Sequence, residues 1–346
     1  MEYWRKRGKR IIMNKILTIS IAAYNVENFI KKAVDSLLEI NNAKDIEILV
    51  EDDGGTDNTA NIVKEYEEKY PDIVKLIHKE NGGYGSTINK SIELAQGKYF
   101  KQLDGDDWYD SKNFQNFIEI LKKTDVDVVY TPYLKYFEKD GSTMIRDWFD
   151  TDIKGEYKIN EIIPKANHEL NMHAMSFKTE ILKNNNIKLL EKCFYTDTEY
   201  AMYPMIYSKT IYISHEYIYV YRVGRDEQSM SAKGRVKHYN DHIKVSKKLN
   251  DFVKENCNNL EENIKKYIVE YTSLMSSATI ANYIMLLPCN KENLKLIKEF
   301  EKYILEEKTD VYKTMKEKSK VIKTLRNTDY LAYKLLAYMK KKQFNK

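Results

Sequence analysis

Short apolar segments that alternate with helical patterns are the strongest constraint on the fold of this chain. Residues 17–23 form a continuous apolar run of strand length, which is typical of a strand buried on both faces of a parallel sheet. Residues 46–50, 73–78 and 99–103 have strand character as well. Helical spacing separates these segments, so the pattern predicts an α/β fold with a parallel sheet covered by helices.

Polar residues follow the end of each predicted strand. They are Tyr24, Asn25 and Glu27 after the first, Asp52 and Asp53 after the second, Asn81, Gly82 and Gly83 after the third, and Asp104 to Asp107 after the fourth. The carboxyl ends of parallel strands meet at one edge of a sheet, and α/β proteins bind their ligands there. The sequence therefore predicts one binding site that these four segments share.

Three carboxylates within four residues surround Gly105. Asp104, Asp106 and Asp107 repel one another, and each tends to raise the pKa of its neighbours. A divalent cation removes this conflict, since Mg²⁺ and Mn²⁺ prefer oxygen ligands and bridge to substrate phosphates. Gly105 allows the backbone to turn around such an ion. The cluster predicts a Mn²⁺ or Mg²⁺ site, and an acidic turn after a strand is the alternative.

Length and composition indicate a protein of about two domains without a membrane span. The chain has 346 residues, 42% of them hydrophobic and 32% charged. No apolar run approaches the ~20 residues that a transmembrane helix needs, and no signal peptide is recognisable. Cys193, Cys257 and Cys289 show no metal or redox spacing. We expect a cytoplasmic protein, with an extension over residues 1–15, a catalytic domain over 16–235 and a helical region over 236–346.

The basic surplus of the chain lies at its C-terminal end. Residues 313–346 contain eleven Lys or Arg and two acids. Tyr330, Leu331, Leu335, Tyr338 and Met339 lie among Lys334, Lys340, Lys341 and Lys342, a pattern typical of helices that lie on anionic membranes. A helix packed on the body, with a frayed basic end, is the alternative.

The strand-end motifs resemble those of the family-two glycosyltransferases in order and spacing. They are TISIAAYNVE (18–27), ILVEDDGGTD (48–57), NGGYGSTIN (81–89) and Asp104-Gly-Asp-Asp107, and the resemblance covers roughly residues 16–230. It implies a Rossmann-like nucleotide-binding fold of the GT-A type, a nucleotide-sugar donor, a divalent metal and inversion at the anomeric carbon. Ala22 stands where the family usually has proline, which puts the rigidity of that loop in doubt.

The resemblance also implies roles for single residues near the donor. Asp53 matches the carboxylate that hydrogen-bonds the nucleotide base. The other donor-binding residues that it implies are Ala23, Tyr24, Asn25, Glu27, Asn81, Gly82 and Gly83. Asp104 and Asp106 match the metal-binding DXD motif, with Asp104 also directed towards the ribose. Asp107 is expected to support the cluster or to cap the following helix.

The catalytic base is expected after the cluster, in Thr196-Asp-Thr-Glu199. Asp197 aligns with the base of the family, Glu199 is the second candidate, and a helix-capping role for Asp197 is the alternative. Arg222 and Arg225 are expected near the donor diphosphate, in a polar loop that follows a strand. His173 is a candidate for contact with the acceptor or a phosphate, although a lone histidine is more often structural.

These observations predict an inverting, metal-dependent glycosyltransferase that moves one sugar to a cell-envelope glycan or its lipid-linked precursor. The expected partners are a nucleotide-diphosphate sugar, that acceptor and an anionic membrane surface, with no nucleic acid. Peripheral attachment to the inner face of the membrane would follow. Two other classes remain open from sequence: a sugar nucleotidyltransferase and a nucleotide-binding module without catalysis.

Overall fold

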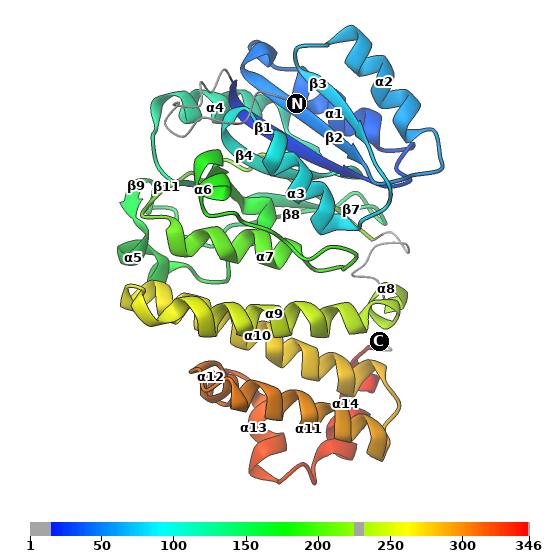
Figure 1. Cartoon of the computed structure of the whole chain (residues 1–346), viewed down its shortest axis with the longest axis vertical. Coiled ribbons are helices and arrows are strands. Elements are labelled where there is room, and N and C mark those ends of the chain that lie inside the picture. The colour runs from blue at the N-terminus through cyan, green and yellow to red at the C-terminus, as the bar shows by residue number, and fades with distance from the viewer. Residues whose placement is uncertain (1–14, 225–231, 345–346) are drawn as a thin grey trace.

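Two parts make up the chain in this computed structural model, which describes residues 15–224 and 232–344. A mixed α/β body lies above a stack of helices in the view of Figure 1. The α/β class and the C-terminal helical region predicted from sequence are therefore confirmed. The expected N-terminal extension lies outside the described residues except for Lys15, and the domain boundary near residue 235 stays a prediction.

Eight strands form the main sheet, in the order β3-β2-β1-β4-β10-β6-β11-β9. Four neighbouring strands are parallel: β1 (Lys15–Ala23), β2 (Ile46–Asp52), β3 (Val74–His78) and β4 (Gly97–Asp104). Ala23 lies opposite Asp52, and Ala22 lies opposite Asp104. The winding of the chain reverses between β1 and β4, and α/β sheets bind ligands outside such a point.

The rest of the main sheet is shorter and mixed in direction. β10 (Met175–Lys178) is antiparallel to both β4 and β6 (Val128–Tyr130). β11 (Thr210–Ile213) runs parallel to β6, and β9 (Gly155–Lys158) closes the edge in the antiparallel direction.

Helices cover the parallel strands in two groups. α1 (Ile30–Leu38) packs with α2 (Thr59–Lys69) and α4 (Ser111–Lys123), whereas α3 (Tyr84–Leu94) packs with α6 (Thr179–Asn184). The side chain of Asp110 accepts the Asn113 N–H at 2.9 Å and caps α4. The cap role considered for Asp107 is therefore wrong.

A second sheet has the strand order β5-β12-β7-β8. Its strands are β5 (Trp108–Tyr109), β7 (Tyr133–Phe137), β8 (Thr143–Arg146) and β12 (Tyr219–Val223). Residues 211–221 are dense in Tyr and Ile and are predicted from sequence as one strand. That prediction is wrong, because β11 and β12 belong to different sheets. Between them His215 Nδ1 lies 2.6 Å from Asp147 Oδ2, and this polar contact holds the chain where it changes sheets.

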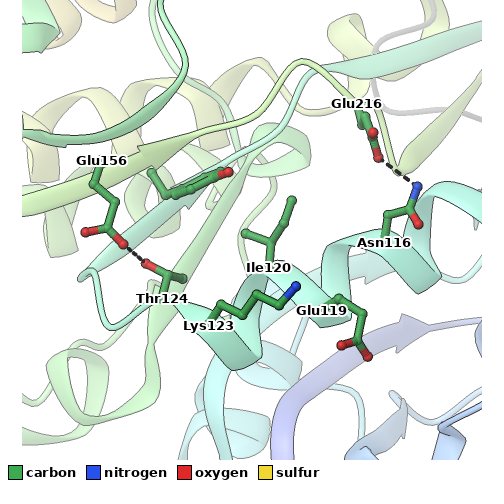
Figure 2. A pocket seen from close by; sticks show the side chains of 8 residues that line it. Asn116, Glu119, Ile120, Lys123, Thr124, Glu156 and Glu216 are labelled. Carbon is green, nitrogen blue, oxygen red and sulfur yellow. Dashed lines mark hydrogen bonds between the residues drawn. The ribbon is translucent and has the colours of Figure 1, made fainter.

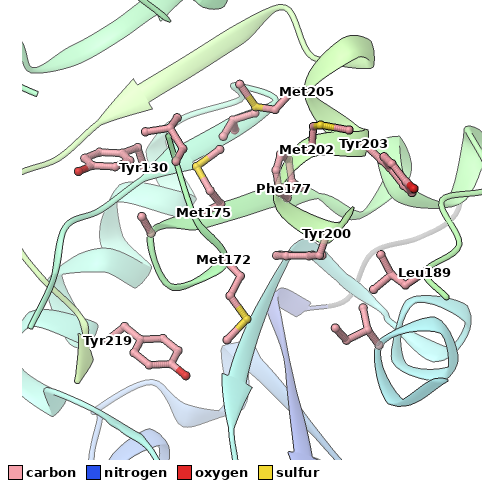
Figure 3. Packing of buried hydrophobic residues seen from close by; sticks show 14 of the residues in the cluster. Tyr130, Met172, Met175, Phe177, Leu189, Tyr200, Met202, Tyr203, Met205 and Tyr219 are labelled. Atoms are coloured by element: carbon pink, nitrogen blue, oxygen red, sulfur yellow. The ribbon is translucent and has the colours of Figure 1, made fainter. Parts of the chain in front are cut away.

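An aromatic and methionine-rich core joins β10 to α7 (Asp197–Met202), the helix that carries the predicted base (Figure 3). Tyr200 of α7 packs its ring edge-on against Phe177 of β10, with the ring centroids 5.4 Å apart. Its hydroxyl donates to the Phe100 carbonyl of β4 at 3.3 Å. These contacts fix the start of α7 relative to the end of β4.

The helical region is attached to the body by hydrogen bonds as well as by apolar packing. Its elements are α8 (Ala232–Lys237), α9 (Tyr239–Asn256), α10 (Glu262–Leu286), α11 (Lys291–Glu306), α12 (Val311–Lys318), α13 (Lys320–Asn327) and α14 (Tyr333–Phe344). The Leu170 N–H donates to the Tyr267 hydroxyl of α10 at 3.1 Å, and Asn263 Nδ2 donates to the Asn160 carbonyl at 2.8 Å.

Two features of the helical region were not predicted correctly. The sequence predicts helices over residues 236–256, 263–287, 291–306 and 329–339. Helices α12 and α13 are missing from that prediction, and the last helix, α14, begins later than expected, at Tyr333. Asp329 and Tyr330 have positive φ angles of 45° and 64°, a left-handed backbone that interrupts the helical path before α14.

We predict that the Glu51→Gln substitution stabilises the protein above neutral pH. Glu51 is fully buried on β2, and burial raises its pKa to about 7, although Ser91 Oγ donates to it at 2.9 Å. The unfolded chain ionises this carboxyl near pH 4.5, so its contribution to stability falls as pH rises from about 4.5 to about 7. The substitution should raise the free energy of unfolding by about 1–3 kcal/mol at pH 8 and change it little at pH 4.

Urea denaturation at both pH values measures this difference, and the exposed Glu68→Gln of α2 controls for the loss of one negative charge. An equal effect of Glu51→Gln at pH 4 and pH 8 would contradict the prediction.

Candidate active site

The loop after β1 is tied to the loop after β2 by side chains that were assigned to the nucleotide pocket. Asn25 Oδ1 and Glu27 Oε2 each accept a backbone N–H of the second loop at 2.8 Å. Asn25 has a φ of 52°, which asparagine tolerates better than most residues. Ala23 is buried at the end of β1, and the Tyr24 side chain next to it is 54% exposed. Tyr24 is thus open to a stacking ligand.

Asp53 connects the ends of β2 and β3. Its two carboxylate oxygens accept the N–H groups of Gly82 (2.9 Å) and Gly83 (2.8 Å), and one of them forms an ion pair with Lys79. Asn81 Nδ2 donates to the Asp53 carbonyl at 2.9 Å. Gly83 has a φ of 78°, and a Cβ there would lie 2.9 Å from backbone that precedes α7. The structure thus brings the predicted donor residues of these two loops together.

The carboxylates after β4 are held by tyrosine hydroxyls. Tyr84, the first residue of α3, donates to Asp104 Oδ1 at 2.7 Å. Tyr219 of β12 donates to Asp107 Oδ2 at 2.7 Å and accepts the Asp104 N–H at 3.1 Å. Burial and the charge of Asp106 raise the pKa of Asp104 to about 7, and the same causes raise the pKa of Asp107 well above its usual value.

His173 lies against the same cluster in the 3₁₀ helix η3 (Met172–Ala174). Its ring stacks on Tyr133 at 5.0 Å and meets the Tyr219 ring edge-on at 4.7 Å. Burial, together with the charges of Lys101 and Lys135, lowers the pKa of His173 to about 3, so the imidazole is neutral.

Lys101 fixes the segment that carries His173. It is completely buried in β4, and its Nζ donates to the carbonyls of His173 (2.9 Å) and Met175 (3.2 Å). Burial lowers the pKa of Lys101 to about 7.

The residues around the cluster fit a divalent metal. Asp104, Asp107 and His173 each offer one ligand atom, and these atoms lie within 4.8 Å of one another. Carboxylate oxygens and a neutral imidazole are suitable ligands for Mn²⁺, and the carboxylates also suit Mg²⁺. The predicted pair was Asp104 and Asp106, so Asp107 and His173 are additions, and direct ligation by Asp106 stays a prediction.

Of the two base candidates, Asp197 lies beside the cluster. Its charge contributes to raising the pKa values of Asp104 and Tyr84, and burial raises its own pKa. Glu199 is fully buried, with one carboxylate oxygen accepting the Tyr203 hydroxyl at 2.7 Å and the other accepting a backbone N–H at 2.8 Å. The contacts of Glu199 hold α7 in place, which leaves Asp197 as the better candidate for the base.

Arg222 contacts the cluster through both its backbone N–H and its guanidinium. Its N–H donates to Asp107 Oδ1 at 2.7 Å, and its Nε donates to the Asp106 carbonyl at 2.8 Å. The guanidinium forms an ion pair with Glu138 and lies 4.8 Å from the Trp108 ring centroid. A role for Arg222 at the donor diphosphate stays a prediction, and Arg225 lies outside the described residues.

A separate surface pocket is formed between α4 and the β9–β11 edge (Figure 2). It is lined mainly by polar side chains, including Glu119, Glu156 and Glu216. None of the residues predicted to act in the site lines this pocket.

Sequence reasoning missed Lys101 and the hydroxyls of Tyr84 and Tyr219. A lysine inside a strand as apolar as residues 99–103 is unusual and was the available signal for Lys101. Residues 217–221 are dense in tyrosine, but nothing in the sequence distinguishes the tyrosine that reaches Asp107.

The strand order, with an acidic cluster where the winding of the chain reverses, defines an α/β fold with a ligand site at the ends of its parallel strands. Residues 18–185 match the family Glycosyl transferase family 2. This match covers just under half of the chain. Together with the similarities that follow, it supports a family-two glycosyltransferase, and the enzyme class predicted from sequence is confirmed.

Two relatives and one solved structure illustrate the similarity. The chain is 29% identical over 245 residues to uncharacterized glycosyltransferase MG060 of Mycoplasma genitalium, covering 67% of this chain and 78% of that protein. It is 27% identical over 249 residues to minor teichoic acid biosynthesis protein GgaB of Bacillus subtilis, covering 70% of this chain but only 27% of GgaB.

The solved structure is S. aureus TarS 1–349 in complex with UDP-GlcNAc. It superimposes with a TM-score of 0.67 at 16% identity, covering 95% of this chain and 92% of that one. This likeness confirms the fold, including the helical region. Among the residues that the structure describes, no helix is both long and apolar enough to cross a bilayer.

We predict that Tyr219→Phe destabilises the protein by about 1–3 kcal/mol, because it leaves a buried Asp107 oxygen and the Asp104 N–H without the hydroxyl that both contact. Urea denaturation measures the loss. The control is Tyr212→Phe, a partly buried tyrosine of β11. Equal stability of Tyr219→Phe and the wild type would contradict the assigned hydrogen bonds.

Proposed function

We propose that this chain transfers one sugar from a nucleotide-diphosphate donor to an acceptor hydroxyl with inversion. The observation that carries the proposal is the position of Asp197 beside the Asp104–Asp107 cluster, at the edge where β1, β2 and β4 end. A base carboxylate and a cation-binding cluster at one switch point are what an in-line displacement of a diphosphate needs. The family match favours this reading over a nucleotidyltransferase or a non-catalytic module.

The donor would bind along the loops after β1, β2 and β3. Tyr24 offers an exposed ring for stacking on a nucleotide base. The carboxylate of Asp53 is buried and holds the Gly82 and Gly83 N–H groups, so its contact with the base stays a prediction. Gly82 and Gly83 permit close approach of the diphosphate to the start of α3, where backbone N–H groups favour anions. The UDP-GlcNAc complex of the structurally similar TarS makes a uridine-diphosphate sugar the first donor to test.

Asp197 would act as the general base. As the acceptor oxygen forms its bond to the anomeric carbon, the bond from that carbon to the diphosphate oxygen breaks and the nucleoside diphosphate leaves. Asp197 takes the proton of the attacking hydroxyl. The raised pKa of Asp197, which burial causes, makes its carboxylate a stronger proton acceptor near neutral pH.

Asp104, Asp107 and His173, with Asp106 nearby, would hold Mn²⁺ or Mg²⁺. A bound divalent ion supplies positive charge that stabilises the leaving diphosphate. Tyr84 and Tyr219 orient the carboxylates for this role, since each donates to one of them.

We predict that Asp197→Asn lowers turnover by about 10²–10⁴ while leaving the donor dissociation constant within a few-fold of wild type. Release of nucleoside diphosphate measures turnover, and calorimetry with UDP-GlcNAc and other nucleotide sugars in MnCl₂ measures binding. Glu199→Gln is the matched comparison, and its main effect should be lower thermal stability because it disturbs the contacts of Glu199. Full turnover in Asp197→Asn, or equal losses of binding and turnover, would contradict the assignment.

The acceptor is proposed to be a cell-envelope glycan or its lipid-linked precursor, and α14 supports a site of action at a membrane. One side of this segment is buried through Tyr333 and Ala337. The other side exposes Leu331 (88%), Leu335 (62%), Tyr338 (68%) and Met339 (50%) next to Lys334, Lys340, Lys341 and Lys342. Exposed apolar side chains flanked by lysines suit peripheral attachment to an anionic bilayer.

We predict that the double substitution Leu335→Ser and Tyr338→Ser reduces binding to phosphatidylglycerol vesicles several-fold without changing net charge. Co-sedimentation measures binding, and phosphatidylcholine vesicles should bind less of the wild type because they lack anionic charge. Leu305→Ser is the control, since Leu305 is a 52% exposed leucine at the end of α11. Unchanged binding of the double variant would show that α14 does not contact the bilayer.

A further inference from the structure

One face of the second sheet carries two cations among aromatic side chains. In the strand register Arg146 of β8 lies opposite Tyr133 of β7, and Lys135 of β7 lies opposite Tyr221 of β12. Alternate residues of a strand share a face, so Tyr133 and Lys135 lie on the same side of β7. Lys135 Nζ is 6.0 Å from the Tyr221 ring centroid, which places the ammonium over that ring.

The two cations have no carboxylate partner within residues 15–224 and 232–344. Asp147, which follows Arg146, is held instead by His215 at 2.6 Å. Burial and the nearby charge of Arg146 lower the pKa of Lys135. The Nε–H of Arg146 is buried without an acceptor, while its guanidinium lies 4.7 Å from the Trp148 ring. Two half-buried positive charges repel each other, and a buried N–H donor without an acceptor destabilises the fold. A bound anion would relieve both effects.

This face reaches the reaction site through His173 and Tyr221. The His173 ring lies 4.7 Å from the Tyr221 ring and stacks on Tyr133. The charge of Lys135 acts on His173, which is one of the three residues that fit a metal. Burial, and after it the charges of Asp107 and Asp197 among others, raise the pKa of the Tyr221 hydroxyl. Lys135 is thus one layer of rings away from His173.

We propose that Lys135 and Arg146 bind a phosphate group of the acceptor, so that the acceptor is an anionic, phosphate-bearing glycan or glycan precursor. This inference rests on the proposed transferase function and deepens it. A guanidinium offers a planar fork of donors to phosphate, and an ammonium adds a compact charge. In the proposed function, the donor diphosphate binds instead at the Asp104–Asp107 cluster and the start of α3.

Two sources of such a phosphate are distinguishable. One is a phosphodiester within a polymer, and the other is the diphosphate of a lipid-linked precursor. Soluble poly(glycerol phosphate) represents the first, farnesyl diphosphate represents the second, and uncharged dextran tests for binding without phosphate.

The experiment compares wild type with the double variant Lys135→Gln and Arg146→Gln. We expect poly(glycerol phosphate) or farnesyl diphosphate to bind wild type, and the double variant to bind that probe at least tenfold more weakly. Wild-type binding should weaken with added NaCl, and dextran should not bind. Arg146→Lys should show intermediate affinity, since it keeps the charge and loses the fork. Lys139→Gln with Lys209→Gln, two exposed lysines, is the charge-matched control and should bind as wild type does.

Calorimetry with UDP-GlcNAc and MnCl₂ on the same variants separates this proposal from the proposed function. Donor binding that survives in the double variant, together with lost phosphate binding, supports the acceptor site. Equal phosphate binding in the double variant and wild type, or equal binding of dextran, overturns it. Loss of donor binding in the double variant also overturns it, because the cations would then serve the donor. Absence of nucleotide-sugar binding in wild type would instead count against the transferase function, and retained phosphate binding would still locate an anion site.

Discussion

Repulsion between several carboxylates that lie close together in a largely buried position is the constraint on which the rest of the site depends. Asp104 and Asp107 are surrounded by protein, and Asp106 and Asp197 add further negative charge. Each unit of pKa shift represents about 1.4 kcal/mol of discrimination against the charged form. Without a bound cation, these carboxyl groups therefore keep their protons to a higher pH than ordinary aspartates do. Binding of a divalent ion to the ionised form would release those protons, which couples metal affinity to pH.

Tyrosine hydroxyls and a buried lysine orient the groups around Asp104 and Asp107. Tyr84 and Tyr219 each donate one hydroxyl to a carboxylate, and Lys101 holds the backbone that carries His173. The guanidinium of Arg222 donates to the Asp106 carbonyl and forms an ion pair with Glu138. The hydroxyls that hold Asp104 and Asp107 do not cancel their charge, so these two carboxylates keep an affinity for a cation that members of a structural ion-pair network lack.

The part of the site that depends on strand ends could be predicted from sequence. Parallel strands fix where the loops converge, so Asp53, Gly82 and Asp104 could be placed at one edge before any coordinates were known. Roles that depend on side chains from distant elements could not be predicted in this way. Tyr219 reaches Asp107 from a strand 112 residues later, and no periodicity in the sequence encodes that contact. Glu199 and Asp197 are two residues apart, and only their contacts in the folded chain show that Glu199 anchors α7 while Asp197 is the candidate base.

The same limit explains the error over residues 211–221. A uniform run of Tyr and Ile indicates strand, but it does not indicate where the chain leaves one sheet and joins another. Because the chain changes sheets there, β12 contacts both the carboxylate cluster and the proposed acceptor face. Tyr219 and the Arg222 backbone contact the Asp104–Asp107 cluster, while Tyr221 lies under Lys135 on the proposed acceptor face. A displacement of β12 on acceptor binding would therefore alter the hydrogen bonds to Asp107, so a single strand links acceptor recognition to the carboxylates at the donor site.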